Sequence, residues 1–240
     1  MRLRSARSAP RGGAPCPDAA RTELDGIACD HGTVFPIASE ETGLDVRRAE
    51  QLARSELGYA GEGLPGTLSP KAMRVVADAI RAPFGTSPET CAQGIFDLGI
   101  GTGSAALSLF TAMGVPEVLG VEVSGCAART ASIALAHTAV QRGEILAGEA
   151  PRALERWRGR DFSRWALFTF CTGINEDTVL ASLQFAGRFR TAVYVDRPRA
   201  IRKLSAQVPA AWRQNILPCK MVMSRSSGGE TFQAIVFAPA

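Results

Sequence analysis

Closely spaced metal ligands are missing from this sequence. It contains two histidines, His31 and His137, and its six cysteines are scattered without a Cys-x-x-Cys pair. Zinc and iron–sulfur sites need clustered thiolates or imidazoles, so we expect no structural metal. Scattered cysteines also favour reduced thiols inside a cell over a disulfide framework.

Long apolar runs are missing as well. No run approaches the roughly 20 residues of a membrane-spanning helix, so we expect no membrane contact. No apolar segment follows the N-terminal arginines, which argues against a secretory signal. The composition, with 46% hydrophobic and 21% charged residues, is that of an ordinary globular protein with one substantial core.

An excess of positive charge exists only near the N-terminus. The formal net charge is +4, and Arg2, Arg4, Arg7 and Arg11 account for all of it, so the rest of the chain is formally neutral. We therefore expect nucleic-acid contact through this segment at most. Residues 1–26 are rich in Arg, Ser, Ala, Gly and Pro and predict a disordered basic tail, with a transit peptide or a nucleic-acid-binding arm as alternatives.

Residues 27–90 are predicted to form a helical cover with a loop. Apolar residues recur at helical spacing from Thr42 onward, and four glycines and one proline mark residues 58–68 as a loop. Ser69 and Pro70 then indicate the start of a second helix, because serine caps helices and proline suits the first helical position. The buried face of this second helix is predicted to consist of Met73, Val76, Ala77 and Ile80.

Residues 91–240 are predicted to form an α/β domain. Five short runs are apolar throughout, as expected of strands that are covered on both faces in a parallel sheet. These runs span residues 95–98, 118–123, 145–147, 165–170 and 191–195. Helices are expected between them, at residues 105–113, in a segment that ends at Ala136, and at residues 176–183.

The last two strands differ from the others. Residues 216–223 and 231–237 are joined by residues 224–230, a link too short for the crossover helix that parallel neighbours require. They are therefore predicted to form an antiparallel hairpin. A Rossmann-like, seven-stranded, mostly parallel sheet that ends in such a hairpin resembles the class I methyltransferase architecture. A dinucleotide-binding dehydrogenase does not end in this way.

A glycine-rich loop, DLGIGTG at residues 97–103, joins the first predicted strand to the helix that follows it. Glycine allows the backbone to turn sharply and to approach a ligand closely. In the class I methyltransferase pattern, the matching loop packs against the methionine part of S-adenosylmethionine, and the acid faces its amino group. The resemblance implies cofactor contacts by Asp97, Gly99, Gly101, Thr102 and Gly103.

Two further acids bear on the choice of cofactor, because residues 101–106 also satisfy the G-x-G-x-x-A pattern of nicotinamide and flavin enzymes. Glu122 ends the second strand, where an acid accepts the ribose hydroxyls of either cofactor. Glu149 follows the third strand and resembles the methyltransferase residue beside the adenine amino group. Dehydrogenases rarely have an acid there, so Glu149 and the terminal hairpin favour S-adenosylmethionine over NAD(P).

The segment after the fourth strand faces the transferred methyl group in this fold, and here residues 168–175 read FTFCTGIN. It lacks the Asn/Asp-Pro-Pro-aromatic pattern of enzymes that methylate adenine or glutamine nitrogens. Cys171, Thr172 and Asn175 are the candidates nearest the acceptor, and no catalytic residue is assigned. Cys171 is either a nucleophile or, as is commoner, a small buried thiol. Asn175 either binds the acceptor or begins the following helix.

An upstream loop resembles the disruptor-of-telomeric-silencing family of histone lysine methyltransferases. Residues 59–65 are similar to the Tyr-Gly-Glu loop that folds over the cofactor in that family, and the resemblance implies cofactor contacts by Tyr59 and Glu62. The Asp-Leu-Gly of residues 97–99 and the Gly-Val-Glu of residues 120–122 follow in the family's order.

This resemblance covers about residues 44–185 and implies a histone-lysine N-methyltransferase, with a histone or nucleosome as partner and the nucleus as its location. It departs from the family at Ala60, which interrupts the loop pattern, and after the fourth strand, where the paired asparagines are absent. The alternatives are a methyltransferase of the same fold that acts on a small molecule or another protein, and a degenerate cofactor-binding module. The alternative location is the cytoplasm or, if residues 1–26 are a transit peptide, an organelle.

Overall fold

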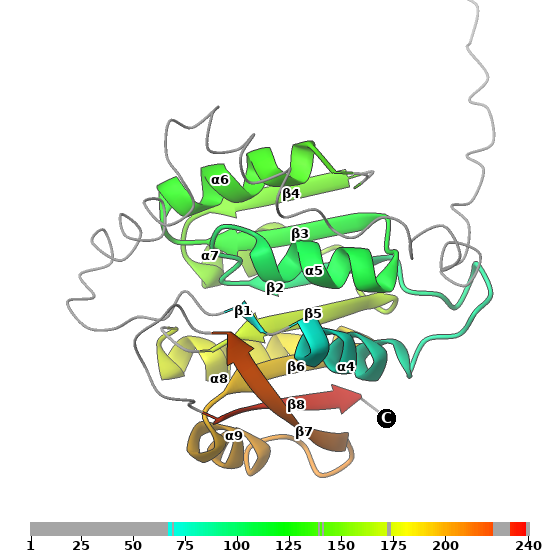
Figure 1. Ribbon diagram of the computed structural model, residues 1–240. Helices are drawn as coiled ribbons and strands as arrows, with labels where there is room; N and C mark the ends of the chain where they lie inside the picture. Colours follow the sequence, from blue (N-terminus) through cyan, green and yellow to red (C-terminus); the bar gives the residue numbers. More distant parts are fainter. Residues whose placement is uncertain are drawn as a thin grey trace, which may run out of the picture.

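The computed structural model describes residues 67–68, 70–138, 140, 142–171, 174–222 and 231–238 (Figure 1). The predicted basic tail and most of the predicted helical cover lie outside these residues, as do Tyr59, Glu62 and Thr172. The predicted domain boundaries therefore stay predictions. Within the described part of the chain, no helix is long and apolar enough to cross a membrane.

The described strands form one eight-stranded sheet in the order β1-β7-β8-β6-β5-β2-β3-β4. Neighbours among β2 to β6 pair in parallel, whereas β8 lies between β6 and β7 and is antiparallel to both. The strand bounds are β1 (Thr67–Leu68), β2 (Gly94–Leu98), β3 (Glu117–Glu122), β4 (Arg142–Ala147), β5 (Trp165–Phe170), β6 (Thr191–Asp196), β7 (Arg213–Val222) and β8 (Thr231–Ala238). The predicted parallel sheet with a terminal antiparallel hairpin is confirmed, and β1 adds a short strand against β7 that the sequence did not indicate.

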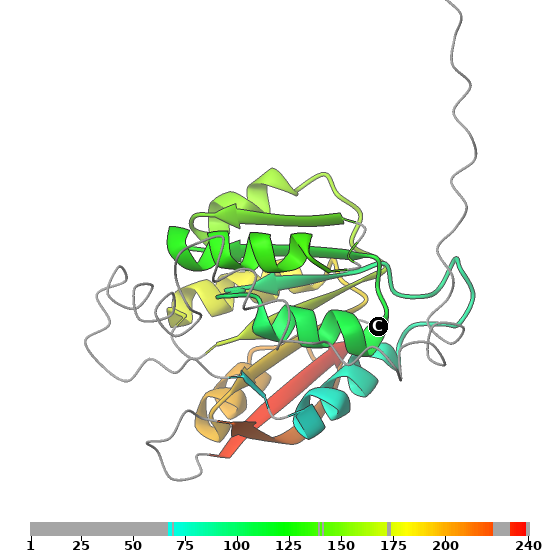
Figure 2. The same cartoon turned by 45° about the horizontal axis from the view of Figure 1, so that its top comes forward.

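Helices cover both faces of this sheet. Helices α4, α5 and α6 contribute buried side chains on one face, and α7, α8 and α9 on the other. In Figure 1 α4 and α5 lie in front of the strands, and Figure 2 shows α5 and α6 on the near side as well. Their bounds are α4 (Pro70–Arg81), α5 (Ser104–Met113), α6 (Gly125–Ala136), α7 (Ala150–Arg156), α8 (Glu176–Ala186) and α9 (Pro198–Ser205).

The two covered faces explain why the central strands are mostly apolar. Every residue of β2 is buried: Ile95 packs in the cluster with α4 and α5, whereas Phe96 and Leu98 pack in the cluster with α7, α8 and α9. Successive side chains of a strand point to opposite faces, so neither face leaves room for a solvated polar residue. Strand β4 lies at the edge of the sheet and is partly exposed over its length.

The sequence pattern missed two short helices, α7 and α9. They contain 7 and 8 residues, too few turns for a helical repeat of apolar residues to stand out. Each has a proline in its first two positions, Pro151 and Pro198, which is a favourable helix start that could have been recognised. The second predicted helix of the cover matches α4, and all four of its predicted buried residues are buried.

An aromatic cluster holds α7, α8 and the strands together. The ring of Phe162, which is 1% exposed, stacks on Phe189 at 4.6 Å between centroids. It also meets the edges or faces of Phe96, Trp165 and Phe185 at 5.6 to 5.8 Å. Such pairs add to the large apolar area that each ring removes from water.

We predict that Phe162→Ala lowers the free energy of unfolding by about 3–5 kcal/mol, because it removes this ring and leaves a cavity among four others. Phe162→Leu keeps most of the apolar volume and should cost less than half as much. Chemical denaturation of the two variants and the parent measures the difference. A loss below about 1 kcal/mol for Phe162→Ala would contradict a stabilising role for the cluster.

Candidate cofactor-binding and acceptor site

The candidate site lies at the carboxyl ends of the parallel strands, beside β2. Strand β2 has β3 on one side and β5 on the other, so the chain leaves it in one direction and later returns on the opposite side. In parallel α/β sheets this change of direction opens a crevice outside the carboxyl ends of the strands, where ligands bind. The predicted glycine loop follows β2 directly at this position.

Three glycines of the loop adopt the left-handed conformation that favours glycine. Their φ angles are 81° at Gly99, 57° at Gly101 and 92° at Gly103. A Cβ on Gly99 would lie 2.8 Å from Cδ1 of Ile174, and one on Gly103 would lie 3.3 Å from Cβ of Ala131.

Gly101 differs from these two neighbours. A Cβ there would have nothing within 4 Å among the described residues. Gly99 and Gly103 therefore allow the protein to pack against itself, whereas Gly101 presents backbone to open space. The predicted Thr102 lies between Gly101 and Gly103 and is buried, with 5% of its surface exposed. A ligand can approach the loop most closely at Gly101.

Glu122 connects the end of β3 to the glycine loop. Its Oε2 accepts a hydrogen bond of 2.9 Å from the backbone N–H of Gly101, and its Oε1 accepts one of 2.9 Å from the N–H of Ser124. The residue is 8% exposed. Each carboxylate oxygen has a second lone pair, so these bonds leave capacity for the ribose hydroxyls that the sequence assigns to Glu122.

Asp97 is buried without a hydrogen-bond partner. It is 1% exposed, and among the described residues neither Oδ1 nor Oδ2 receives a hydrogen bond. Burial, and secondly the nearby charge of Glu122, raise the pKa of the Asp97 carboxyl well above its usual value. Buried polar groups are nearly always paired, so an orphaned carboxyl at the start of this loop fits a ligand that brings a hydrogen-bond donor or a cation.

The third predicted acid, Glu149, follows β4 at the same edge. It is exposed and has extended backbone directly before α7. The preceding Gly148 has φ 146°, and its N–H donates 2.8 Å to the carbonyl of Glu122, which ties the end of β4 to the end of β3. The structure thus places Asp97, Glu122 and Glu149 at the ends of three adjacent strands, as the sequence order predicts.

The acceptor candidates after β5 have local structural roles. The Oδ1 of Asn175 accepts a bond of 2.8 Å from the N–H of Asp177, which makes Asn175 the N-cap of α8. Cys171 is buried, its N–H donates to Val195, and its thiol points toward the carbonyl of Thr169. Burial, and then the charge of Asp196, raise the pKa of this thiol well above its usual value, so the geometry favours the buried-thiol interpretation over a nucleophile.

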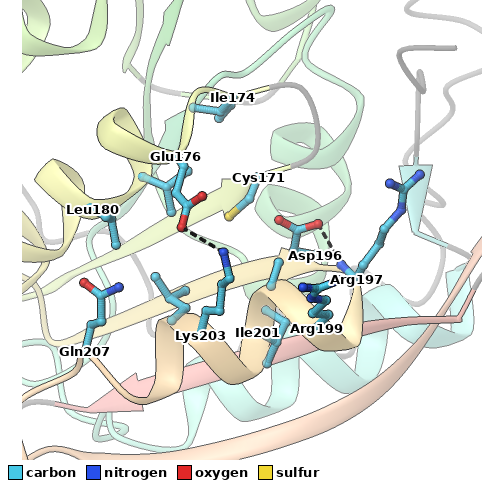
Figure 3. A pocket seen from close by; sticks show the side chains of 13 residues that line it. Cys171, Ile174, Glu176, Leu180, Asp196, Arg197, Arg199, Ile201, Lys203 and Gln207 are labelled. Carbon is cyan, nitrogen blue, oxygen red and sulfur yellow. Dashed lines mark hydrogen bonds and ion pairs between the residues drawn. The ribbon is translucent and has the colours of Figure 1, made fainter. Parts of the chain in front are cut away.

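A cavity of about 300 Å³ lies between α8 and α9, at the carboxyl ends of β5 and β6 (Figure 3). Sequence reasoning missed it, because its walls come from helices separated by a whole strand. Charged side chains from these elements line it: Glu176, Asp196, Arg197, Arg199 and Lys203. Its apolar lining includes Cys171, Ile174, Val179, Leu180, Ile201 and Leu204.

Ile174 connects this cavity to the glycine loop. The side chain lines the cavity, and its Cδ1 lies 2.8 Å from the position that a Cβ on Gly99 would take. One side chain is therefore next to both the cavity and the first glycine of the loop. An occupant of the cavity would lie close to a ligand held by the loop.

Solved structures that include methyltransferases have a similar fold. The O-methyltransferase from Bacillus cereus in complex with SAH superposes with a TM-score of 0.55 at 14% identity, covering 80% of this chain and 90% of that one. Cofactor-bound Rv0187 from MTB has a TM-score of 0.57 at 18% identity, with 95% and 100% covered. TomG from Streptomyces achromogenes is an O-methyltransferase involved in tomaymycin synthesis, solved in complex with SAM. It has a TM-score of 0.54 at 15% identity, covering 81% of this chain and 89% of that one.

Sequence comparison adds no assignment: no protein-family model and no curated protein matches the chain. The likeness to the solved structures concerns the fold, since identity is below a fifth in all three. The order of the parallel strands, the inserted antiparallel β8 and the glycine loop after β2 agree with it. The chain therefore has the Rossmann-like fold of class I S-adenosylmethionine-dependent methyltransferases.

Proposed function

We propose that this protein transfers a methyl group from S-adenosylmethionine to a small molecule. The observation that carries the proposal is the buried carboxyl of Asp97, which has no hydrogen-bond partner among the described residues, beside a loop whose Gly101 has no described atom in front of it. The ammonium group of the cofactor's methionine part is a cation of the kind that this carboxyl lacks. Neighbours of the same fold hold SAH or SAM, which supports the proposal.

The acids at the strand ends would hold the cofactor at three points. Asp97 would pair with the ammonium group, Glu122 would accept the ribose hydroxyls, and Glu149 would lie beside the adenine. The backbone bonds from Gly101 and Ser124 already fix the Glu122 carboxylate, so little ordering remains for binding. When bound, S-adenosylmethionine supplies a methyl group activated by its sulfonium.

Methyl transfer asks mainly for alignment and the exclusion of water. The bond from the acceptor to the methyl group would form as the bond from sulfur to the methyl group breaks, with S-adenosylhomocysteine as the leaving group. A hydroxyl acceptor would also release one proton, which can pass to water, whereas an acceptor that is already an anion needs no base. The chain's own contribution is to hold the loop, through Glu122, and to offer the adjoining cavity behind Ile174 for the acceptor.

The size of the cavity favours a small molecule as acceptor. A volume of about 300 Å³ is at the lower end of the range for small-molecule sites. Two of the three neighbours compared above are O-methyltransferases, one of them in tomaymycin synthesis. The histone-lysine interpretation, with its nucleosome partner and nuclear location, gains no support from these neighbours, and the alternative in which a small molecule is methylated fits them better.

Methyl-group transfer from labelled S-adenosylmethionine tests the proposal directly. We expect label in a low-molecular-weight acceptor from a pool of hydroxylated metabolites, and none in histones or nucleosomes. S-adenosylhomocysteine at about 100 times its dissociation constant should add roughly 2.7 kcal/mol to the stability of the protein, whereas NADH and NADPH should add nothing. Label in histones alone would support the other acceptor class, and stabilisation by NADPH alone would refute the cofactor assignment.

Gly101→Asn should abolish cofactor binding while the protein stays folded. Asparagine tolerates the left-handed backbone of Gly101 better than other residues do, and its side chain would fill the open space in front of the loop. Gly159→Asn is the matched control, because a Cβ there also meets nothing within 4 Å of described atoms, away from the loop. Calorimetric titration with S-adenosylhomocysteine compares the two. Unchanged affinity in Gly101→Asn would place the ligand elsewhere.

Asp97→Asn should weaken cofactor binding and stabilise the free protein. The variant would lose the charged hydrogen bond from the cofactor's ammonium group to Asp97, and such a loss lowers the affinity by roughly 10- to 150-fold. The pKa of Asp97 is higher in the folded protein than in the unfolded chain. The parent protein is therefore most stable at a pH below the pKa of the unfolded chain, and it loses stability as the pH rises through the pKa of the folded protein. Asparagine does not ionise, so the variant does not lose stability in this way. The unfolding free energy of the variant minus that of the parent should therefore increase from pH 4 to pH 8. A variant less stable than the parent at every pH would show that Asp97 has an internal partner.

A further inference from the structure

The cavity between α8 and α9 carries positive charge on one wall. Arg197 directly precedes α9, Arg199 lies in its first turn and Lys203 in its last turn, and all three are lining residues of the cavity. The acids that face them are Glu176, at the start of α8, and Asp196, at the end of β6 (Figure 3). Figure 3 shows the side chain of Arg197 pointing away from the cavity, so Arg199 and Lys203 are the cations of this wall, beside a largely apolar interior.

Among the described residues, one of these cations, Lys203, forms an exposed ion pair with Glu176. Nζ of Lys203 lies 3.6 Å from Oε1 of Glu176, and the two side chains are 59% and 64% exposed. Ion pairs this exposed contribute little to stability. A ligand carboxylate that reaches Lys203 can therefore replace Glu176 at small cost.

The interior of the cavity suits an apolar ligand body. Val179 and Leu180 of α8 face Ile201 and Leu204 of α9 across it. Ile174 closes it toward the glycine loop, as described above. A molecule that fills this space with an apolar body would point one end at the loop and leave the other near Lys203.

We infer that this cavity binds the acceptor, and that the acceptor is a small carboxylic acid with an aromatic or branched apolar body. Lys203 pairs with the carboxylate in place of Glu176, and the apolar residues of α8 and α9 hold the body. That the bound acid is a methyl acceptor rests on the proposed methyltransferase function. The binding of the acid in the cavity does not depend on the cofactor.

The test uses the full chain and a panel of aromatic and branched aliphatic carboxylates, each matched with its primary amide. Ligand-observed NMR titrations, with and without S-adenosylhomocysteine, give the affinities. We expect at least one carboxylate to bind about tenfold or more tightly than its amide, a loss of that preference in Lys203→Ala, and its retention in Lys203→Arg. Glu176→Gln should tighten carboxylate binding, because it frees Lys203 from its competing partner.

Lys71→Ala is the control, since Lys71 is an exposed lysine of α4, on the opposite face of the sheet. It should leave every affinity unchanged. The inference is overturned if no carboxylate is preferred over its amide, or if Lys203→Ala keeps the preference. Failure of S-adenosylhomocysteine to bind while the carboxylate preference persists would instead reject the proposed function and leave the anion site standing.

Discussion

The carboxylate of Glu122 is the interaction on which the site depends. A short loop with three left-handed glycines has little conformational preference of its own, because glycine gives up more backbone freedom on folding than any other residue. The bond from Gly101 to Glu122 fixes that loop to the end of β3, and the bond from Ser124 fixes the start of α6 to the same group. One buried acid thus sets the relative positions of two strand ends and a helix N-terminus.

The parallel sheet could be predicted from the sequence because strands that are buried on both faces appear as short apolar runs. The predicted ends of strands β5 and β6 agree with the structure within one residue, since nearly all residues between those ends are apolar. The hairpin followed from the length of its link. Strand β1 could not be predicted, because a pair of residues against β7 carries no periodicity and depends entirely on its neighbour.

The two halves of the candidate site differ in how much the sequence reveals. The cofactor half is continuous in the chain: the glycines and the acids at strand ends form local patterns, and the structure brings Asp97, Glu122 and Glu149 to one edge. The acceptor half is made by packing. The apolar spacing of α8 predicts that this helix buries a face, but not that it leaves a space beside α9, nor that Lys203 and Glu176 meet across that space. The residues that did stand out there, Cys171 and Asn175, have a buried thiol and a helix cap as their roles in the described structure.

The unpartnered carboxyl of Asp97 has a consequence for thermodynamic linkage. In the free protein, burial favours its neutral form, whereas a bound cation favours its ionised form. At a pH below the raised pKa, binding of a cation must therefore release a proton from Asp97. By linkage, the affinity for the cation decreases as the pH falls. The affinity increases as the pH rises, until the carboxyl of the free protein is itself ionised. The same burial that disfavours the ionised carboxyl of Asp97 would make ligand binding depend on pH.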